Sequence, residues 1–250
     1  MIPKKIHYCW FGRNPLPESA QKCIASWRKY LPDYEIIEWN EDNFDVNSIP
    51  YTAQAYTAKK YAFVSDYARF KILHEQGGLY FDTDVEVIRP MDDIIARGPF
   101  MGFEIDPSKK LPYGAVAPGL GLGAYPAMSI YAQIIETYKN FQFMDENGKI
   151  NQTTVVSYTT DILKTEGLSS KPGIQTLAGL TIYPKEYFNP LDDNTGRLRV
   201  TDNTRSIHWY SKTWLEVSPF RVYISRLSHR IFGDSFIPKM RKFLKQIRIK

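Results

Sequence analysis

Extended and helical patterns alternate along the first hundred residues, and this alternation is the feature that most restricts the fold. Residues 5–12 form a short apolar and aromatic run that predicts a buried strand, and residues 34–39 predict a second one. Apolar side chains recur at helical spacing between these strands, over 18–30, and again over 52–76, before a strand-like run over 79–88. Such alternation predicts an α/β fold, in which ligands bind where the strand ends open into loops.

The second half of the chain carries weaker patterns. We expect helices near 127–140 and 153–165 and a strand near 179–184. The glycines of residues 119–123 lack the spacing of a dinucleotide-binding loop, so we interpret this segment as a loop or as backbone of an acceptor site. The chain has 250 residues, of which 43% are hydrophobic, and this is enough for one catalytic domain, which we assign to residues 1–220.

Two carboxylates follow the third predicted strand, in the sequence Asp82-Thr83-Asp84. On a strand, residues i and i+2 point to the same side, so both carboxylates could address one cation. Mg²⁺ and Mn²⁺ are held by a few carboxylates together with phosphate oxygens. Solvated surface acids are the alternative interpretation. Directly after an apolar strand, however, two unpaired carboxylates would repel each other, which favours a metal or another cationic partner.

A second pair of charged residues lies upstream, within the predicted helix over 52–76. Asp66 and Arg69 are three residues apart and therefore share one helix face. They could form an ordinary helix ion pair. The functional alternative is that Asp66 accepts hydrogen bonds from sugar hydroxyls while the Arg69 guanidinium donates to a carboxylate or phosphate.

Two motifs together, Ser65-Asp66-x-x-Arg69 and Gly77-Gly78-Leu-Tyr-Phe-Asp-Thr-Asp84, resemble the DXD-containing sugar-binding region of glycosyltransferase family 32. This family groups with capsular polysaccharide glycosyltransferases, yeast mannosyltransferases and, more remotely, the glucosylating domain of large clostridial toxins. The resemblance covers residues 3–90 and recurs near 206–214. It implies a GT-A fold, which is a Rossmann-like mixed sheet flanked by helices, together with a nucleotide-diphosphate sugar donor and Mn²⁺ or Mg²⁺ bridging its diphosphate.

The resemblance also implies roles for individual residues. Asp82 and Asp84 would serve the ion and, with Arg69, form the catalytic group. Trp10 would stack on the base, which favours UDP, although a core aromatic at a strand end is the alternative. The residues implied to bind the donor are Trp10, Phe11, Ser65, Asp66, Arg69, Tyr80, Thr83, Ser211, Lys212 and Trp214.

A late segment, Ser206 to Trp214, resembles the family element His-Trp-x-x-Ser-Trp, here one residue longer before the second tryptophan. A neutral imidazole is a competent ligand for Mn²⁺, so we expect His208 to be the third metal ligand. A packed, hydrogen-bonded core histidine is the alternative. Ser211, Lys212 and Trp214 are expected to close over the diphosphate as a lid.

Family members of this kind retain the anomeric configuration of the transferred hexose, and the sequence offers no convincing protein nucleophile. The metal would act as a Lewis acid on the leaving diphosphate, aided by Lys212 or Arg69. Asn151 and Gln152 are candidates to line the acceptor face, with a helix N-cap role for Asn151 as the alternative. The implied acceptor is a glycan or a lipid-linked oligosaccharide of surface polysaccharide biosynthesis, such as capsule.

The C-terminal residues 221–250 hold nine Lys or Arg against a single acid, Asp234, and interleave them with apolar residues. This pattern predicts a basic amphipathic helical tail interrupted at Pro238, which either packs on the domain or binds an anionic membrane surface. A basic region confined to a tail is not typical of nucleic-acid binding. The N-terminus has no signal-peptide pattern, no apolar run is long enough to span a membrane, and Cys9 and Cys23 cannot form a disulfide framework. We therefore expect a cytoplasmic protein, peripheral on the cytoplasmic face of the membrane.

Two other classes of protein share parts of this pattern. Haloacid-dehalogenase-like phosphatases also place DxD after an apolar strand, but near the start of the chain and with Thr or Val where this sequence has Glu86. A non-catalytic sugar- or lipid-binding module is the second alternative. Simple sugar binding does not need two carboxylates, Arg69 and His208 together, which favours the transferase.

Overall fold

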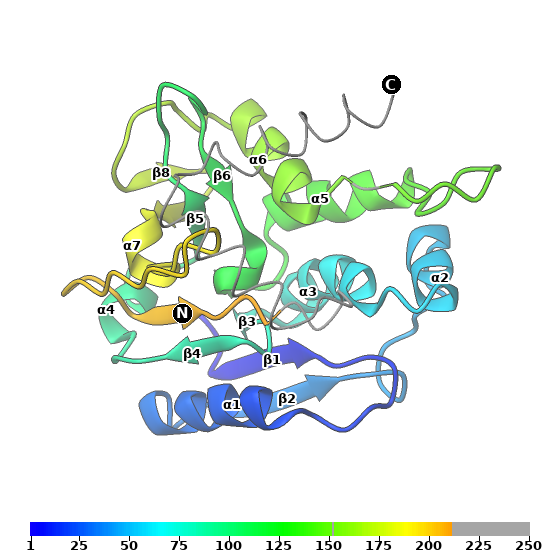
Figure 1. Ribbon diagram of the computed structural model, residues 1–250, viewed down its shortest axis with the longest axis horizontal. Coiled ribbons are helices and arrows are strands. Elements are labelled where there is room, and N and C mark those ends of the chain that lie inside the picture. The colour runs from blue at the N-terminus through cyan, green and yellow to red at the C-terminus, as the bar shows by residue number, and fades with distance from the viewer. Residues whose placement is uncertain (152, 212–250) are drawn as a thin grey trace, which may run out of the picture.

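A mixed sheet runs through the centre of the molecule, with helices on both of its faces (Figure 1). The computed structural model describes residues 1–151 and 153–211. Pairs β1–β2, β1–β3 and β5–β9 are parallel, and the other neighbours in the sheet are antiparallel. In spatial order the strands are β2 (Glu35–Trp39), β1 (Lys5–Cys9), β3 (Gly78–Tyr80), β7 (Leu122–Ala124), β5 (Phe100–Ile105), β9 (Leu180–Tyr183) and β8 (Gln175–Leu177), with β6 (Ala115–Val116) also paired to β5.

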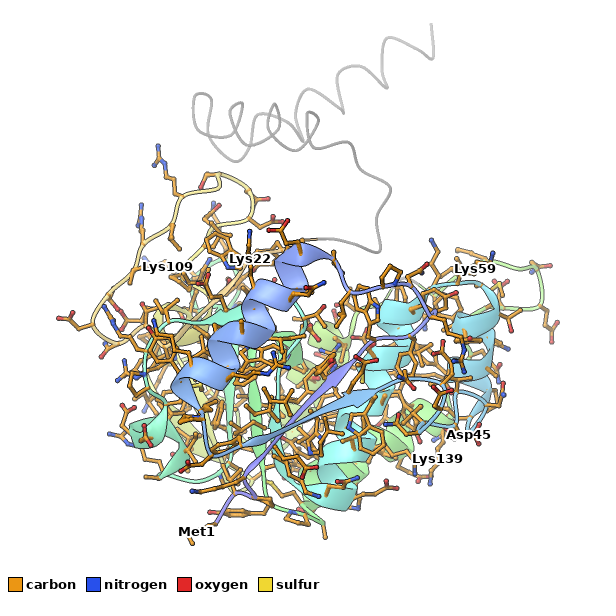
Figure 2. The ribbon with its side chains drawn as sticks, turned by 90° about the horizontal axis from the view of Figure 1, so that it is seen from below. Met1, Lys22, Asp45, Lys59, Lys109 and Lys139 are labelled. Carbon is orange, nitrogen blue, oxygen red and sulfur yellow. The ribbon has the colours of Figure 1, made fainter. Side chains whose placement is uncertain are left out.

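The helices connect and cover these strands. They are α1 (Glu18–Tyr30), α2 (Pro50–Thr57), α3 (Tyr61–Gln76), α4 (Asp92–Ile95), α5 (Ser129–Lys139), α6 (Val155–Thr165) and α7 (Lys185–Phe188), with a 3₁₀ turn, η1, at Pro118–Leu120. The predicted opening of strand, helix and parallel strand is confirmed by β1, α1 and β2. Helix α1 packs against β4 and runs beside β1 and β2, with the exposed Lys22 labelled on it (Figure 2). The predicted helices near 127–140 and 153–165 and the strand near 179–184 are confirmed by α5, α6 and β9.

The single helix predicted over 52–76 is wrong. The chain forms two helices, α2 and α3, separated at Ala58–Lys60. Lys59 adopts a left-handed backbone with φ of +56°, and the Lys60 N–H bonds to the Ala55 carbonyl, so the first helix closes before the second begins. Gly77 caps the C-terminus of α3 with φ of +63°, a left-handed backbone that favours glycine.

The strand predicted over 79–88 is also wrong as one element. It is two short strands, β3 and β4 (Val85–Val87), which belong to different sheets. Strand β4 pairs antiparallel with β10 (Ser206–His208), and Trp27 of α1 fixes the resulting ribbon by donating its indole N–H to the Val85 carbonyl at 2.8 Å. This ribbon brings residues more than a hundred positions apart in the chain to the end of β3.

Two hydrophobic clusters lie on the two faces of the sheet, and the residues of β3 alternate between them. Tyr80 packs with the cluster under α3 and α5, whereas Leu79 and Phe81 pack with the cluster under α1 and α7. All three side chains are almost completely buried. The strand that leads to the aspartate pair is thus fixed from both sides.

The segment 119–123 was predicted as a loop or as backbone of an acceptor site; the loop is wrong in part, because the segment includes the end of η1 and most of β7, which pairs with β3. Cys9 and Cys23 are free and buried. None of the helices in the described part of the chain is long and apolar enough to cross a membrane. The predicted tail over 221–250 lies outside the described residues.

Candidate active site

The aspartate pair lies on a tight turn between β3 and β4. The Asp82 N–H bonds to the Gly119 carbonyl at 3.3 Å, and the Val85 N–H bonds back to the Asp82 carbonyl at 3.0 Å. Because the pair is on a turn, the expected same-side geometry of a strand does not apply. The carboxylates of Asp82 and Asp84 nevertheless lie within 4.8 Å of each other. Each of them is held by a different neighbouring element.

Helix α3 supplies the partners of Asp82. The Arg69 guanidinium lies 2.8 Å from the Asp66 carboxylate and 3.3 Å from the Asp82 carboxylate, both through Nη2. Its Nε donates to the Ser65 carbonyl at 3.1 Å, and its charged end lies 5.0 Å from the centre of the Tyr80 ring. The predicted ion pair between Asp66 and Arg69 is therefore confirmed, and Asp82 joins it from a separate element.

Burial dominates the electrostatics of this group. Desolvation raises the pKa of Asp66 to about 7, because Arg69 offsets only part of the cost and Asp82 adds repulsion. The pKa of Asp82 is also raised by burial, and Arg69 again opposes the shift. For Arg69, burial favours the neutral form, but Asp82, Tyr80 and Asp66 together outweigh it and raise its pKa. Arg69 is thus a permanent buried cation between two carboxylates.

The ribbon of β4 and β10 supplies the partners of Asp84. His208 Nε2 lies 3.1 Å from Asp84 Oδ1, and the Ser211 backbone N–H and hydroxyl donate to Asp84 Oδ2 at 2.8 and 3.0 Å. The Trp209 N–H bonds to the Asp84 carbonyl at 2.9 Å. The segment 208–211 therefore contacts both carboxylate oxygens and the backbone carbonyl of Asp84.

Asp84 is the more acidic of the two aspartates. Burial alone would raise its pKa, but His208 and Ser211 outweigh burial and lower it to about 2. For His208, burial favours the neutral ring, whereas Asp84 and Asp82 favour the charged ring and raise its pKa overall.

The donor atoms of Asp82, Asp84 and His208 fit a divalent cation. One oxygen or nitrogen from each of the three residues lies within 4.8 Å of the others. Asp66 and Asp82 share the single guanidinium of Arg69, and Asp84 adds a third carboxylate beside His208, so a divalent cation would offset the excess negative charge. The second ring nitrogen of His208, Nδ1, is buried without a hydrogen-bond partner among the described residues. Two carboxylates and one imidazole suit Mn²⁺ or Mg²⁺.

Gly119 provides the space for the Asp82 carboxylate, a role that was not predicted from the sequence. A β-carbon built on Gly119 would lie 2.1 Å from Asp82 Oδ2 and 3.4 Å from the Arg69 guanidinium. Such a contact is too close for any side chain. The spacing of residues 119–123 does not reveal this role, because the contact depends on the pairing of β7 with β3.

The other residues predicted to bind the donor lie at different depths around this group. Tyr80 is buried and donates its hydroxyl to Asp82 Oδ1 at 3.0 Å, while the Ser65 hydroxyl bonds within α3 to Tyr61. Trp10, at the end of β1, is half-buried and bonds through its indole to the Asn14 carbonyl. Phe11 packs edge to face on Phe44 in the core. Thr83 is half-buried in the turn itself.

Asn151 lies elsewhere. It lines a polar cavity of about 770 Å³ with Thr153, Thr154 and Ser157, and no residue of the aspartate turn lines this cavity. Its amide donates to the Tyr158 hydroxyl at 2.8 Å. The alternative N-cap role is wrong, because Thr154 caps α6 by accepting from the Ser157 N–H. Gln152, Lys212 and Trp214 lie outside the described residues.

Comparison with known proteins identifies the region that carries this site. Residues 17–101 match the family described as "Glycosyltransferase sugar-binding region containing DXD motif", about a third of the chain. The fold resembles that of a crystal structure titled as a glycosyltransferase involved in the glycosylation of the major capsid of PBCV-1. The TM-score is 0.50 and the identity 10%, with 90% of this chain and all of that one covered.

Two yeast proteins are similar to this chain in sequence. Inositol phosphoceramide mannosyltransferase 1 of Schizosaccharomyces pombe is 28% identical over 116 residues, which cover 40% of this chain and 33% of that protein. Mannosyl phosphorylinositol ceramide synthase CSH1 of Saccharomyces cerevisiae is 26% identical over 167 residues, covering 64% of this chain and 40% of its own length. The chain thus spans well under half the length of these curated relatives.

The mixed sheet, with the aspartate turn at the end of β3, has the fold of GT-A glycosyltransferases. Within this fold, Asp66, Arg69, Asp82 and Asp84 all lie in the segment that matches the DXD-containing glycosyltransferase sugar-binding region.

Proposed function

We propose that this protein transfers a hexose from a nucleotide-diphosphate sugar, with UDP as the favoured nucleotide, to a glycan or lipid-linked acceptor, with retention of anomeric configuration. The observation that carries the proposal is the convergence of Asp82, Asp84 and His208 from two strands, beside the buried Asp66–Arg69 pair of α3. Neither a phosphatase of the dehalogenase type nor a simple sugar-binding module accounts for this combination of groups.

Each residue has a distinct task in this proposal. Asp82, Asp84 and His208 would hold Mn²⁺ or Mg²⁺, which would stabilise the negative charge of the departing nucleotide diphosphate. Arg69 is a permanent cation beside Asp82 and would add to that stabilisation without a proton change. Asp66 has an oxygen within reach of Arg69 and would accept hydrogen bonds from the hydroxyl groups of the donor sugar.

A lipid-linked acceptor fits both the relatives and the sequence. The names of the two yeast proteins mention inositol phosphoceramide or phosphorylinositol ceramide together with a mannosyl group. The basic residues over 221–250 would be attracted to an anionic membrane surface. We propose on this basis that the protein works peripherally at the cytoplasmic face of a membrane, in the assembly of a surface polysaccharide such as capsule.

The test is metal-dependent hydrolysis of donors in the absence of acceptor. The protein is incubated with Mn²⁺ and a panel of UDP- and GDP-sugars, and nucleotide release is followed for the wild type, Asp84→Asn and Asp33→Asn. Asp33 is an exposed residue that pairs with Lys4 just before β2 begins, whereas the aspartate turn follows the end of the sheet strand β3. The Asp33→Asn variant should therefore match the wild type. Asp84→Asn should lose on the order of a hundredfold in rate, because it removes a ligand to the metal.

Three further outcomes sharpen the result. Loss of activity on chelation and recovery with Mn²⁺ would support the metal, and ¹H NMR of the released sugar would show whether its anomeric configuration is retained. If no donor is hydrolysed, binding of each donor is measured by calorimetry with Mn²⁺ present. Absence of binding to every nucleotide sugar would overturn the transferase proposal in favour of a binding module.

A further inference from the structure

The backbone at Tyr210 adopts a conformation that tyrosine rarely takes. Its φ is +52°, in the left-handed region that favours glycine. A residue is kept in this region only where surrounding contacts offset the cost, and such residues are common at functional sites. At Tyr210 the left-handed turn folds the chain back, so that His208 and Ser211 both contact the same carboxylate of Asp84.

The Tyr210 side chain is held through its hydroxyl group. Its hydroxyl donates to Glu104 Oε1 at 3.0 Å and accepts from the Asn189 side-chain amide at 2.6 Å. Asn189 is fully buried at the end of α7, and its amide also donates to the Glu104 carbonyl of β5 at 3.4 Å. The Tyr210 hydroxyl is therefore held by Glu104 of the central sheet and by the buried Asn189.

The Tyr210 ring also contacts His208 directly. The centres of the two rings are 4.2 Å apart, with an angle of 56° between their planes. His208 is otherwise held by strand pairing with Val85 and by its contact with Asp84. The ring of Tyr210 thus limits the positions that the imidazole can adopt relative to Asp82 and Asp84.

We propose that Tyr210 is a positioning residue for the metal site, and that its anchorage by Glu104 and Asn189 holds the turn of residues 208–211 around Asp84. This inference rests on the proposed function, because it requires that His208 binds the metal. Tyr210 itself is not expected to touch the donor or the metal. Outer residues that orient metal ligands typically contribute tenfold to a hundredfold to metal affinity.

The test compares two substitutions of the same kind. Tyr210→Phe removes the anchored hydroxyl but keeps the ring. Tyr131→Phe is the matched control, because the Tyr131 hydroxyl is fully buried in α5 and has no hydrogen-bond partner among the described residues. Mn²⁺ affinity is measured by calorimetry with UDP present. The Mn²⁺ concentration for half-maximal donor hydrolysis and the thermal midpoint are measured in parallel.

We expect Tyr210→Phe to raise the Mn²⁺ requirement about tenfold, with kcat at saturating Mn²⁺ within about twofold of the wild type. Tyr131→Phe should leave both values unchanged. A general loss of stability would lower kcat and the thermal midpoint without a selective change in Mn²⁺ requirement.

A second pair of variants keeps the proposal testable if Tyr210→Phe folds poorly. Glu104→Gln keeps an acceptor oxygen for the Tyr210 hydroxyl and should retain wild-type Mn²⁺ affinity, whereas Glu104→Met removes it and should weaken binding about tenfold. Equal Mn²⁺ affinity of the wild type, Tyr210→Phe and Glu104→Met would overturn the inference while the proposed function stands. If the wild type binds no Mn²⁺ with UDP, the proposed function fails and the inference fails with it.

Discussion

Acidification should destabilise the protein through His7, a fully buried residue of β1. The Trp39 indole N–H donates to His7 Nδ1 at 3.0 Å, and His7 Nε2 lies 3.0 Å from the Gly77 carbonyl. A carbonyl can only accept and an indole N–H can only donate, so the neutral ring protonated at Nε2 is required. Burial is the main cause that lowers the pKa of His7 from 6.5 to about 4, and nearby Lys5 adds to it.

The size of the effect follows from this shift. In the unfolded chain the His7 imidazole takes up a proton below pH 6.5, whereas in the folded chain it does so only near pH 4. The folding stability that depends on a neutral His7 is therefore present above pH 6.5 and is lost as the pH falls from 6.5 to about 4. At roughly 1.4 kcal/mol per pH unit, the loss between pH 7.5 and pH 4.5 is about 3 kcal/mol. Asp66 acts in the opposite direction, because its pKa is raised to about 7 and protonating it on acidification relieves a buried charge.

The contribution of His7 is isolated by urea unfolding of the wild type and His7→Asn at several pH values. The variant should be less stable at pH 7.5, and the gap between the two proteins should narrow by about 3 kcal/mol by pH 4.5. His74→Asn is the control, since His74 lies on α3 and contacts the Met128 carbonyl instead. Parallel stability curves for the wild type and His7→Asn would refute the reasoning.

Three further predictions concern the site and the core. Gly119→Ala should lower metal-dependent donor hydrolysis by at least tenfold, because the added methyl group would lie 2.1 Å from Asp82 Oδ2; unchanged kinetics would contradict the packing described. Arg69→Met should destabilise the fold by about 3–5 kcal/mol in urea unfolding, because it leaves Asp66 and Asp82 as buried carboxylates without a cation. The double variant Arg69→Met/Asp66→Asn should recover part of this loss, and a double variant no more stable than Arg69→Met would contradict the pairing. Cys9 and Cys23 should resist a thiol reagent at pH 8 until the protein unfolds, because burial raises the pKa of both thiols to about 12, and rapid labelling of the native protein would show that one of them is accessible.

Local periodicity predicted the elements whose patterns are complete within a few residues. Helix α1 begins and ends where the sequence indicates, since Pro17 precedes it and Pro32 follows it closely. The break between α2 and α3 was missed because it depends on a left-handed lysine, Lys59, and lysine carries no signal for that conformation. The turn that divides the strand over 79–88 was missed for a similar reason, since Asp82-Thr83-Asp84 fits either a strand end or a turn.

Some of the residues that form the site could be predicted from the sequence. The pair Asp66 and Arg69 followed from helical spacing alone, and α3 confirms it. The proximity of His208 to Asp84 depends on the pairing of β4 with β10 across more than a hundred residues, and only the family resemblance suggested it. Gly119 and the Glu104–Tyr210 contact arise from tertiary packing, for which no local pattern exists.

The central claim is that Asp82, Asp84 and His208 bind the cation that carries the nucleotide diphosphate. The most direct measurement is anomalous diffraction at the manganese edge from crystals of the protein soaked with Mn²⁺ and UDP. The account predicts one strong peak within coordination distance, roughly 2.0–2.3 Å, of both carboxylates and the His208 imidazole, with diphosphate oxygens completing the shell. Bound UDP with manganese at another position, or with no manganese at these three residues, would contradict it.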